Sequence, residues 1–511
     1  MDKILVLDFG GQYNLLIARR VRNLNVYAEV KSYDAVTVED IKKEGYGGII
    51  LTGGPNSVND PASPTFSPGL LDAGIPILGI CYGHQLLAKL AGGAVSAGAV
   101  GEYGSCGVEI TAPIDLFDGI PATFNSFMSH HDCVTALPEG FRGAARTANI
   151  EYAAMFDPER RICGVQFHPE VTHTEFGTEI LRNFLFKICG LTADWRMDDF
   201  MEKTITELRE KLDGRNVLLG LSGGVDSSVL AALLYKAVGD RLRCVFVDHG
   251  LLRKDEGDLV EKAFMNTFGM SIIRVDAAKI FLDRLKGVTE PEKKRKIIGE
   301  EFIRIFEAEA MKAGEIDYLA QGTIYPDVVE SGGGKASVIK SHHNVGGLPV
   351  NIKFKGIVEP LRTLFKDEVR ELGRRLGLPD QYVKRQPFPG PGLAVRIIGE
   401  ITGAKLKVLK EADAIMREEL IASLPDPALP DQYFAVLTDT RSVGVMGDER
   451  TYGYTIALRA VDTDDFMTCS FTRIPYEVLE RVSGRITNEI KGVTRVVYDV
   501  TSKPPATVEW E

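Results

Sequence analysis

The sequence contains little cysteine and no long hydrophobic run. Its 511 residues include seven cysteines, and none of them forms a Cys-x-x-Cys pair. Neither a disulfide framework nor a zinc site is therefore expected. No run of about 18 apolar residues occurs, which disfavours a membrane-spanning helix. The segment Ile4–Leu7 behind Met-Asp-Lys is typical of a short strand and not of a signal peptide, so we expect a cytoplasmic protein.

The chain also lacks an excess of positive charge. Its formal net charge is −11, whereas proteins that bind nucleic acid need concentrated cations to neutralise phosphates. The basic run Lys293–Lys296 lies in a charged, helix-like stretch and is expected to be a solvated face. The sequence therefore predicts neither a nucleic-acid partner nor a membrane partner.

No internal repeat is present, and the chain is too long for a single ordinary core. Residues 1–190 alternate short apolar runs with helical patterns, which favours an α/β domain with a parallel or mixed sheet. Its strands are expected at Ile4–Leu7, Gly48–Leu51, Ile77–Ile80 and Ile162–Phe167, and its helices include Gln85–Leu90 and Glu179–Ile188.

A second α/β pattern fills residues 191–386 and predicts a doubly wound parallel sheet. Its elements are expected at Asp198–Leu212, Asn216–Leu221, Val229–Ala237, Leu242–Val247, Glu256–Phe268 and Ser271–Val275. The glycine- and proline-rich stretch Pro387–Gly392 then breaks any regular element. Residues 387–511 predict a small α+β domain with elements at Lys405–Leu420, Tyr433–Leu437, Tyr454–Ala460, Tyr476–Ile490 and Arg495–Val500.

Cys81 stands between glycines, directly after an expected strand and before a helix. This is the arrangement of a nucleophile elbow with cysteine in place of serine. The helix dipole favours the thiolate, and the amide of Tyr82 is placed where an oxyanion would form. A second turn after a strand offers further amides at Gly53 and Gly54. Taken alone, the cysteine motif is also compatible with a buried core residue.

His168 and Glu170 supply a base and a carboxylate. The proline between them keeps the backbone extended, so that both side chains can project to one side. Glu170 can then orient the imidazole, as in a catalytic triad. Taken alone, this segment is also compatible with a polar loop.

Together, these motifs resemble the class I glutamine amidotransferases. The resemblance implies that Cys81 attacks the glutamine amide, which yields a glutamyl thioester and free ammonia. It also implies an oxyanion- and glutamine-binding set made of Gly53, Gly54, Tyr82 and Gln85.

A loop of small residues follows the strand expected at Asn216–Leu221 and precedes a helix. Such a loop lets backbone amides converge on an anion at the helix N-terminus. The loop consists of Ser222, Gly223, Gly224, Val225, Asp226, Ser227 and Ser228. Asp226 is unusual in an anion site unless a cation is present, so it suggests Mg²⁺ bound between carboxylate and phosphates. No Gly-x-x-x-x-Gly-Lys-Ser/Thr motif occurs, which disfavours a kinase or P-loop NTPase.

This loop resembles that of the N-type ATP pyrophosphatases, which split ATP into AMP and pyrophosphate. The resemblance implies that the backbone around Val247 contacts the adenine. The neighbouring Asp248 is equally compatible with a helix cap. A glutaminase joined to an ATP pyrophosphatase indicates ATP-driven amination.

Further stretches resemble the GMP synthetase family along residues 3–511. They are Asp248–Arg253, Gly322–Asp327, Lys340–Gly347, Pro387–Gly392, Arg441–Val445 and Lys503–Glu511. The resemblance implies that ATP adenylylates xanthosine 5′-monophosphate (XMP) on its C2 oxygen and that ammonia displaces AMP to give GMP. It implies XMP contacts at Arg253, Asp327, Lys503 and Glu509, and a homodimer formed through the C-terminal domain. The glycine-rich Ser331–Gly347 suits either a lid over ATP or a loop without a catalytic part.

The chain departs from this family at two places. Ser129–Asp132 reads Ser-His-His-Asp where the family usually has Ser-His-Gly-Asp, which puts regulation by this loop in doubt. Thr438–Thr440 replaces a common Leu-Pro-Val run, a change that we expect to be structural.

Two other functions stay open from the sequence. One is another ATP-dependent amidating or thiolating enzyme with the same loop. Thiolating enzymes usually carry further catalytic cysteines, whereas Cys244 and Cys469 lie in apolar runs typical of a core. The other is a non-catalytic nucleotide sensor, which would have no need of a nucleophile such as Cys81.

Overall fold

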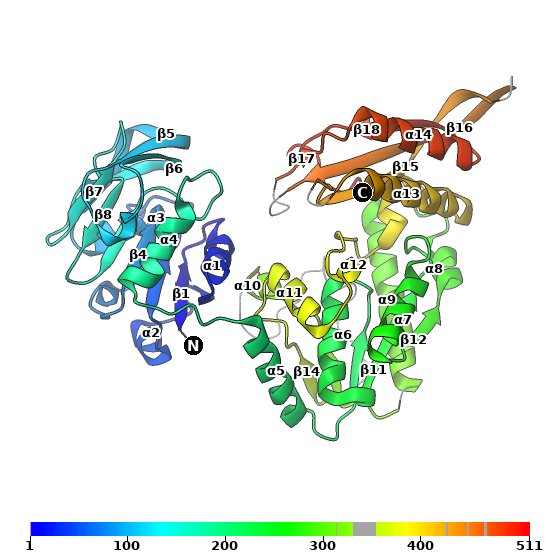
Figure 1. Ribbon diagram of the computed structural model, residues 1–511, viewed down its shortest axis with the longest axis horizontal. Helices are drawn as coiled ribbons and strands as arrows, with labels where there is room; N and C mark the ends of the chain where they lie inside the picture. The colour runs from blue at the N-terminus through cyan, green and yellow to red at the C-terminus, as the bar shows by residue number, and fades with distance from the viewer. Residues whose placement is uncertain (1, 313, 331–353, 426–427, 447–448, 464–467) are drawn as a thin grey trace. The chain divides into compact units, whose positions relative to one another are not determined.

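The computed structural model describes residues 2–312, 314–330, 354–425, 428–446, 449–463 and 468–511 (Figure 1). They form two compact units, one of residues 2–199 and 328–330 and the other of Phe200–Asp327 with the described residues of 336–511. The lid expected at Ser331–Gly347 lies outside the described residues. None of the described helices combines the length and apolar composition needed to cross a bilayer.

The first unit is built on a nine-stranded mixed sheet in the order β2-β1-β3-β4-β9-β8-β7-β5-β6. The first five strands in this order run parallel, and the remaining pairs are antiparallel. The strands are β1 Lys3–Asp8, β2 Tyr27–Ser32, β3 Gly48–Leu51, β4 Ile77–Ile80, β5 Ala94–Ile110, β6 Thr123–Ala136, β7 Arg142–Arg146, β8 Ala154–Asp157 and β9 Ile162–Val165.

The central parallel strands of this sheet are apolar at nearly every position because both of their faces are covered. Every residue of β3, β4 and β9 is buried. The helical elements are α1 Asn14–Asn23, α2 Val38–Glu44, η1 Pro68–Leu70, α3 Tyr82–Leu90, η2 Asp115–Phe117, α4 Gly177–Asn183 and the π-helical turn η3 Phe184–Ile188. The start of α2 is fixed by a capping box between Thr37 and Asp40.

The second unit contains a five-stranded, all-parallel sheet in the order β12-β11-β10-β13-β14. Its strands are β10 Val217–Gly220, β11 Leu242–Asp248, β12 Ile273–Asp276, β13 Tyr318–Ala320 and β14 Gly356–Val358. The helical elements between residues 197 and 383 are α5 Met197–Lys211, α6 Val225–Val238, η4 Gly239–Arg241, α7 Glu256–Phe268, α8 Ala278–Leu285, α9 Pro291–Lys312, α10 Tyr325–Glu330, α11 Lys366–Leu376 and α12 Asp380–Val383.

A smaller sheet follows, on which α13 and α14 lie (Figure 1). Its central strand β16 pairs antiparallel with β15 and β17 and parallel with β18. The elements are η5 Gly392–Arg396, α13 Gly403–Ser423, β15 Gln432–Met446, β16 Glu449–Asp462, β17 Ser470–Phe471, α14 Tyr476–Glu489 and β18 Val493–Asp499. The register of β15 shifts between Leu437 and Arg441, so Thr438–Thr440 forms an irregularity in the strand. One apolar core contains residues from Leu218 to Val493 and so includes both sides of the predicted domain boundary at residues 386–387. That boundary stays a prediction.

The predicted fold class is confirmed: two α/β sheets and a C-terminal α+β part are present. The sequence missed the long hairpin of β5 and β6, whose strands are rich in glycine, alanine, serine and histidine. The prediction that the basic run Lys293–Lys296 is a solvated face was wrong for one of its residues. Lys294 has a relative exposure of 0%, because its ammonium group is enclosed by backbone carbonyls and the Glu511 carboxylate.

Candidate active sites

Cys81 occupies a sharp turn between β4 and α3. Its backbone has φ 53° and ψ −104°, a strained conformation of the kind often found at functional sites. Two glycines make the turn possible. A Cβ on Gly79 would lie 2.6 Å from the Gly83 carbonyl, and a Cβ on Gly83 would lie 2.5 Å from the Leu51 carbonyl oxygen. The two segments can therefore pack this closely only because residues 79 and 83 are glycines without a Cβ atom.

His168 and Glu170 form a buried pair beside this turn. The Nδ1 of His168 lies 2.7 Å from Oε1 of Glu170, and their relative exposures are 4% and 1%. Burial by itself lowers the pKa of His168. The Glu170 carboxylate and the neighbouring Cys81 thiol outweigh it and raise that pKa to about 10. The imidazole is thus held in the charged form that stabilises a thiolate.

Three further groups hold this pair in place, two of them from α1 or the residue that caps it. The guanidinium of Arg20 donates to the Glu170 carbonyl at 2.8 Å, and the Thr174 hydroxyl donates to the His168 carbonyl at 2.6 Å. The Tyr13 ring meets the His168 ring edge-on at 5.2 Å between centroids. The orientation of the imidazole is therefore set by packing as well as by Glu170.

The predicted oxyanion turn lies against the same groups. A Cβ on Gly54 would lie 2.9 Å from Cγ of Tyr82, and a Cβ on Gly53 would lie 3.4 Å from Cε1 of His168. Tyr82 is the first residue of α3, and amides of a first turn have no acceptor within their helix. The structure therefore brings Gly53, Gly54 and Tyr82 close to the thiol and the imidazole.

The sequence missed Gln166, which contacts the thiol directly. Its Nε2 lies 3.6 Å from Sγ of Cys81, and its Oε1 accepts from Nε2 of Gln85 at 3.1 Å. The same Gln85 nitrogen also donates to the Asp132 carbonyl at 2.7 Å. The side-chain nitrogen of Gln85 is thus already engaged within the protein. Gln166 is fully buried, and the only signal in the sequence was a polar residue directly after the apolar strand Ile162–Val165.

The two histidines of the Ser-His-His-Asp segment differ in burial. His130 is buried and lies 3.1 Å from the Glu102 carboxylate through Nε2. Burial lowers the pKa of His130, and the Glu102 carboxylate counteracts this effect only in part. His131, the residue that departs from the family pattern, is exposed.

In the second unit, the phosphate loop Ser222–Ser228 begins in the turn after β10 and ends in α6, whose first turn contains Val225–Ser228. The Ser222 and Ser227 hydroxyls lie 2.9 Å apart, and Gly224 donates its amide to the Ser222 hydroxyl at 3.3 Å. Gly223 has φ +75°, which glycine adopts without strain. The first amides of α6 and its dipole then face the loop, an arrangement suited to phosphate.

Two cations that the sequence did not assign lie at this loop. Lys366 places its Nζ 2.6 Å from both carboxylate oxygens of Asp226, 140 residues away in the chain. Arg385 donates from Nη1 to the Gly223 carbonyl at 2.6 Å. Burial lowers the pKa of Arg385 to about 9. No local sequence pattern could have signalled contacts over such separations.

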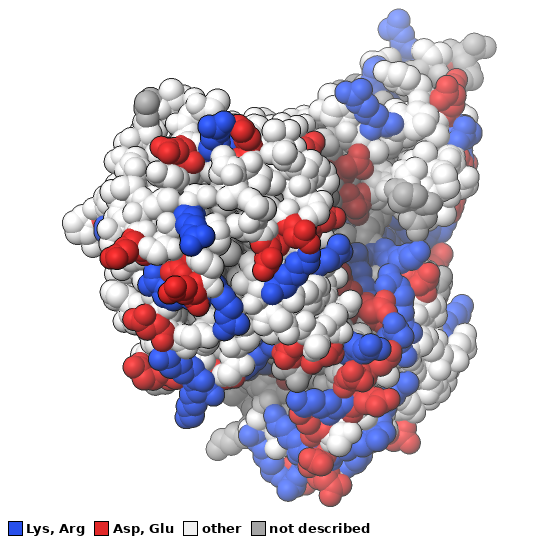
Figure 2. Space-filling model, turned by 60° about the vertical axis from the view of Figure 1, so that its left-hand side comes forward, with Lys and Arg blue, Asp and Glu red and all other residues white. Residues whose placement is uncertain are grey.

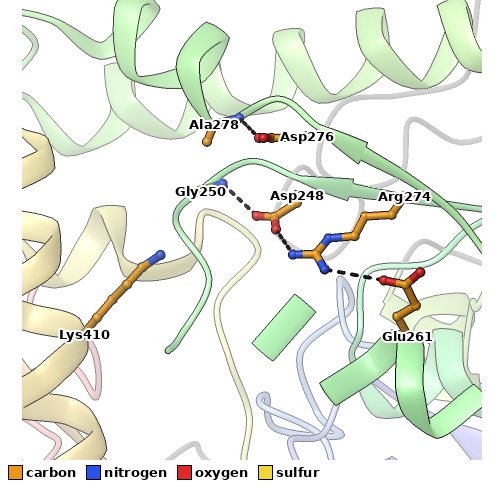
Figure 3. Close-up of a pocket in the computed structure, with 7 residues that line it drawn as sticks. All are labelled: Asp248, Gly250, Glu261, Arg274, Asp276, Ala278 and Lys410. Atoms are coloured by element: carbon orange, nitrogen blue, oxygen red, sulfur yellow. Dashed lines mark hydrogen bonds and ion pairs between the residues drawn. The ribbon is translucent and has the colours of Figure 1, made fainter. Parts of the chain in front are cut away.

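Asp248 lies at the carboxyl end of β11, on the wall of a cavity of about 410 Å³. Figure 3 shows its carboxylate between the Gly250 amide and the Arg274 guanidinium, at 3.1 and 2.7 Å. It therefore closes a turn and pairs with Arg274, and it does not cap a helix. The preceding Val247 is a buried residue of β11. Its contact with adenine stays a prediction.

Arg253 and Glu509 belong to one buried cluster of charges. Nε of Arg253 lies 3.7 Å from Asp413, and Asp413 lies 3.9 Å from Arg396. Arg396 in turn binds Glu509. Burial lowers the pKa of Arg253 to about 10, although Asp413 counteracts this effect. Among the described residues, Nε and Nη2 of Arg253 have no hydrogen-bond acceptor.

The two other predicted XMP residues are held by different contacts. The Asp327 carboxylate accepts from the Ile324 amide at 3.1 Å, at the start of α10. Lys503 exchanges two backbone hydrogen bonds with Cys469, at 2.9 and 3.0 Å.

On the face shown in Figure 2, basic side chains are interspersed with acidic ones, so the described residues of this face form no extended basic patch.

Three family profiles match successive parts of the chain. The profile "Glutamine amidotransferase class-I" matches residues 5–188, "PP-loop domain" matches residues 197–295, and "GMP synthase C terminal domain" matches residues 428–510. The first two ranges contain the cysteine turn and the phosphate loop described above.

Relatives match over nearly their whole length. The glutamine-hydrolysing GMP synthase of Acetivibrio thermocellus is 59% identical over 510 residues, which cover 100% of this chain and 99% of that protein. The enzyme of Clostridium novyi is 59% identical over 511 residues, with the same coverage. That of Treponema denticola is 58% identical over 510 residues, covering 100% and 97%. The chain belongs to the family of glutamine-hydrolysing GMP synthases.

Proposed function

We propose that this chain makes GMP from XMP, with ATP as the activating nucleotide and glutamine as the nitrogen donor. The observation that carries this proposal is a complete thiol, imidazole and carboxylate set in the same chain as a phosphate-binding loop. The first set releases ammonia and the second consumes ATP. Because each half-reaction has its own residues, the two can be tested separately.

In the first half-reaction, the Cys81 thiolate attacks the carboxamide carbon of glutamine. The oxyanion of the tetrahedral intermediate accepts hydrogen bonds from amides of Tyr82 and of the Gly53–Gly54 turn. His168 gives its proton to the leaving nitrogen, so that ammonia departs and a glutamyl thioester remains. Water, deprotonated by His168, then cleaves the thioester and releases glutamate. Gln85 supports glutamine binding through the hydrogen bonds that it makes around Gln166.

In the second half-reaction, the loop Ser222–Ser228 holds the phosphates of ATP, and the backbone at Val247 contacts the adenine. The C2 oxygen of XMP attacks the α-phosphorus, and pyrophosphate leaves. Ammonia then attacks C2 of the adenylyl-XMP, and the C–O bond breaks to release AMP and form GMP. Ammonium has no free electron pair, so the ammonia must arrive unprotonated.

Asp226 is the proposed magnesium ligand at this loop. Magnesium is commonly held by one or two carboxylates together with substrate phosphates, and Asp226 fits that role because it lies in the first turn of α6, the end of the helix that is suited to phosphate. Among the described residues, no group of three or more His, Cys, Asp or Glu forms a metal cage of its own. When bound, the ion neutralises charge on the phosphates. Lys366 balances the Asp226 carboxylate and can also pair with phosphate oxygens.

XMP is proposed to contact Arg253, Asp327, Lys503 and Glu509. The unpartnered donors of Arg253 support this proposal, because a buried guanidinium nitrogen without an acceptor is costly. The proposed domains are residues 1–190 for the glutaminase, 191–386 for the ATP pyrophosphatase, and 387–511 for XMP binding and dimerisation.

We also propose a cytoplasmic homodimer. Several apolar side chains of the β15–β16 hairpin are exposed, including Val443 at 56%, Val445 at 72% and Tyr452 at 65%. Apolar side chains exposed side by side in this way favour a protein interface. All seven cysteines are free thiols, as is usual in a reducing compartment.

The test is an assay of pyrophosphate, AMP and GMP with purified protein, ATP, glutamine and XMP. We expect the three products in equal amounts and no pyrophosphate when XMP is replaced by another acceptor. Consumption of ATP without pyrophosphate and AMP would overturn the proposal. Turnover of a different acceptor in place of XMP would indicate one of the other ATP-dependent amidating enzymes.

A further inference from the structure

The carboxylate of Glu509 is held by a fully buried arginine. Arg396 donates from Nε to Oε2 at 3.0 Å and from Nη2 to Oε1 at 2.8 Å. Gln432 adds a third hydrogen bond at 2.9 Å. The Arg396 guanidinium has a relative exposure of 0% and lies 3.9 Å from the centroid of the Phe434 ring. Two parallel bonds from a rigid fork fix both the position and the plane of a carboxylate.

Two residues further on, Glu511 is held by a fully buried lysine. The Nζ of Lys294 contacts the Glu511 carboxylate and also donates to the Ile397 carbonyl at 2.7 Å. The neighbouring Arg295 donates to the Glu511 backbone carbonyl at 2.5 Å. The Gly399 amide completes the set with a bond to Glu511 Oε1 at 3.4 Å. The segment that ends with these residues is thus anchored at two carboxylates.

Buried ion pairs of this kind contribute little net stability to a fold, because their desolvation is unfavourable. Burying an ion pair removes two charges from water, and apolar side chains of similar volume often stabilise a protein as well or better. An ion pair does, however, hold a carboxylate in one orientation. Moreover, Nη1 of Arg396 has no hydrogen-bond acceptor among the described residues. The arrangement therefore suits a site in which Glu509 must be presented in a fixed position.

We propose that Arg396 and Lys294 are positioning residues for XMP. Arg396 fixes the carboxylate of Glu509, and Lys294 fixes that of Glu511, so that the segment Lys503–Glu511 keeps the shape that receives the substrate. This inference rests on the proposed contact between Glu509 and XMP. It adds two residues that act through the segment and do not need to touch the substrate.

The experiment compares Arg396→Met, Arg396→Lys and Lys294→Met with the unaltered enzyme. Lys296→Met is the matched control, because Lys296 lies on the same helix α9 and is exposed. Ammonium salt serves as nitrogen donor, so that the glutaminase reaction does not enter. KM for XMP, KM for ATP, kcat and the midpoint of thermal unfolding are measured for each variant.

We expect Arg396→Met to raise KM for XMP roughly 10- to 100-fold, because two charge-assisted hydrogen bonds to Glu509 are lost. KM for ATP should stay within about twofold, since ATP binds at the loop Ser222–Ser228. Arg396→Lys keeps the charge but not the parallel bonds, and its effect should be intermediate. Lys294→Met should raise KM for XMP by a smaller factor, and Lys296→Met should leave every value unchanged.

Equal changes in KM for XMP and for ATP would overturn the inference, as would a lower unfolding midpoint with unchanged KM values. If Arg396→Met does not fold, Arg396→Lys still decides the question through the same two KM values. Glu509→Gln separates this inference from the proposed function. An unchanged KM for XMP in that variant refutes the contact itself, whereas a raised value beside a normal Arg396→Met refutes only the positioning role.

Discussion

The two reaction centres of this enzyme differ in how complete they are without substrate. At the glutaminase centre, the imidazole of His168 already has its carboxylate at 2.7 Å and the thiol beside it. At the phosphate loop, the carboxylate of Asp226 is neutralised by Lys366 at 2.6 Å. The first centre therefore already contains its imidazole–carboxylate hydrogen bond, while the second pairs its loop carboxylate with a lysine at the place where we propose that phosphates and Mg²⁺ bind.

The difference follows from where the reacting charges come from. The chain itself supplies the proposed nucleophile, base and carboxylate of the glutaminase. They can therefore be held in a fixed arrangement, which avoids the free energy of reorganisation at the moment of reaction. The charges of the synthetase reaction arrive with ATP. In the proposed mechanism, Lys366 neutralises Asp226 until phosphates and a cation take its place.

The largest expected effect comes from removing the nucleophile. Cys81→Ala should reduce glutamine-dependent GMP formation by on the order of 10⁴-fold or more, because no other group can form the thioester. GMP formation with ammonium salt should be unaffected. The measurement is the rate of GMP formation with each nitrogen donor. If both activities disappeared together, the division between the two centres would be wrong.

Removing the acidic charge of the phosphate loop should affect both nitrogen donors alike. Asp226→Asn should lower GMP formation by on the order of 10²- to 10³-fold with glutamine or ammonium salt, because a charge-stabilising group at the phosphates is lost. Pyrophosphate release in the presence of XMP measures this step. Asp213→Asn, at an exposed position, is the control. A defect confined to glutamine would contradict the proposed role.

The His168–Glu170 pair predicts a pH dependence for the glutaminase centre only. His168 has a pKa raised to about 10, so its imidazolium persists at neutral pH and is lost as the pH rises through that value. In Glu170→Gln the negative charge that favours the imidazolium is gone, so the pKa should fall toward the ordinary histidine value.

The alkaline limb of glutamine hydrolysis should accordingly move to lower pH, with a rate at neutral pH reduced roughly 10²-fold or more. Profiles of kcat/KM for glutamine across the neutral and alkaline range measure the shift. Glu179→Gln, at an exposed position, should keep the original profile. An unmoved alkaline limb in Glu170→Gln would show that Glu170 does not set the charge of His168.

The smallest effect concerns Gln166, whose amide contacts the thiol. Gln166→Leu keeps the volume of the side chain but removes one donor at 3.6 Å from Sγ. We expect kcat/KM for glutamine to fall about tenfold, the scale of one lost hydrogen bond. Turnover with ammonium salt should not change. A loss with both donors would indicate a general defect in folding.

Much of the glutaminase centre could be predicted because its chemistry is local. The elbow at Cys81 is encoded within a few residues by a strand, two glycines and a helix. The spacing of His168 and Glu170 likewise predicts the hydrogen bond that the structure contains. Gln166 was missed even though it stands in the same motif as His168, since a polar side chain in an apolar strand reveals its partner only after folding.

The second centre shows the opposite situation. The loop Ser222–Ser228 is visible in the sequence, but its partner Lys366 begins helix α11, which follows four further strands among the described residues. Lys294 was expected to be solvated because charged neighbours surround it in the sequence. In the fold, carbonyls and the Glu511 carboxylate replace its water, and no local pattern contains that information.

The sequence by itself determined the two reaction types, the α/β architecture and the residues of each short motif. These depend on interactions between residues close in the chain, where propensity, glycine placement and spacing fix the geometry. Only the tertiary structure decided which charges neutralise one another, as in the pairs Asp226–Lys366 and Glu509–Arg396. Ion pairs between distant segments depend on burial and on distances of a few ångströms, and both exist only once the chain has packed.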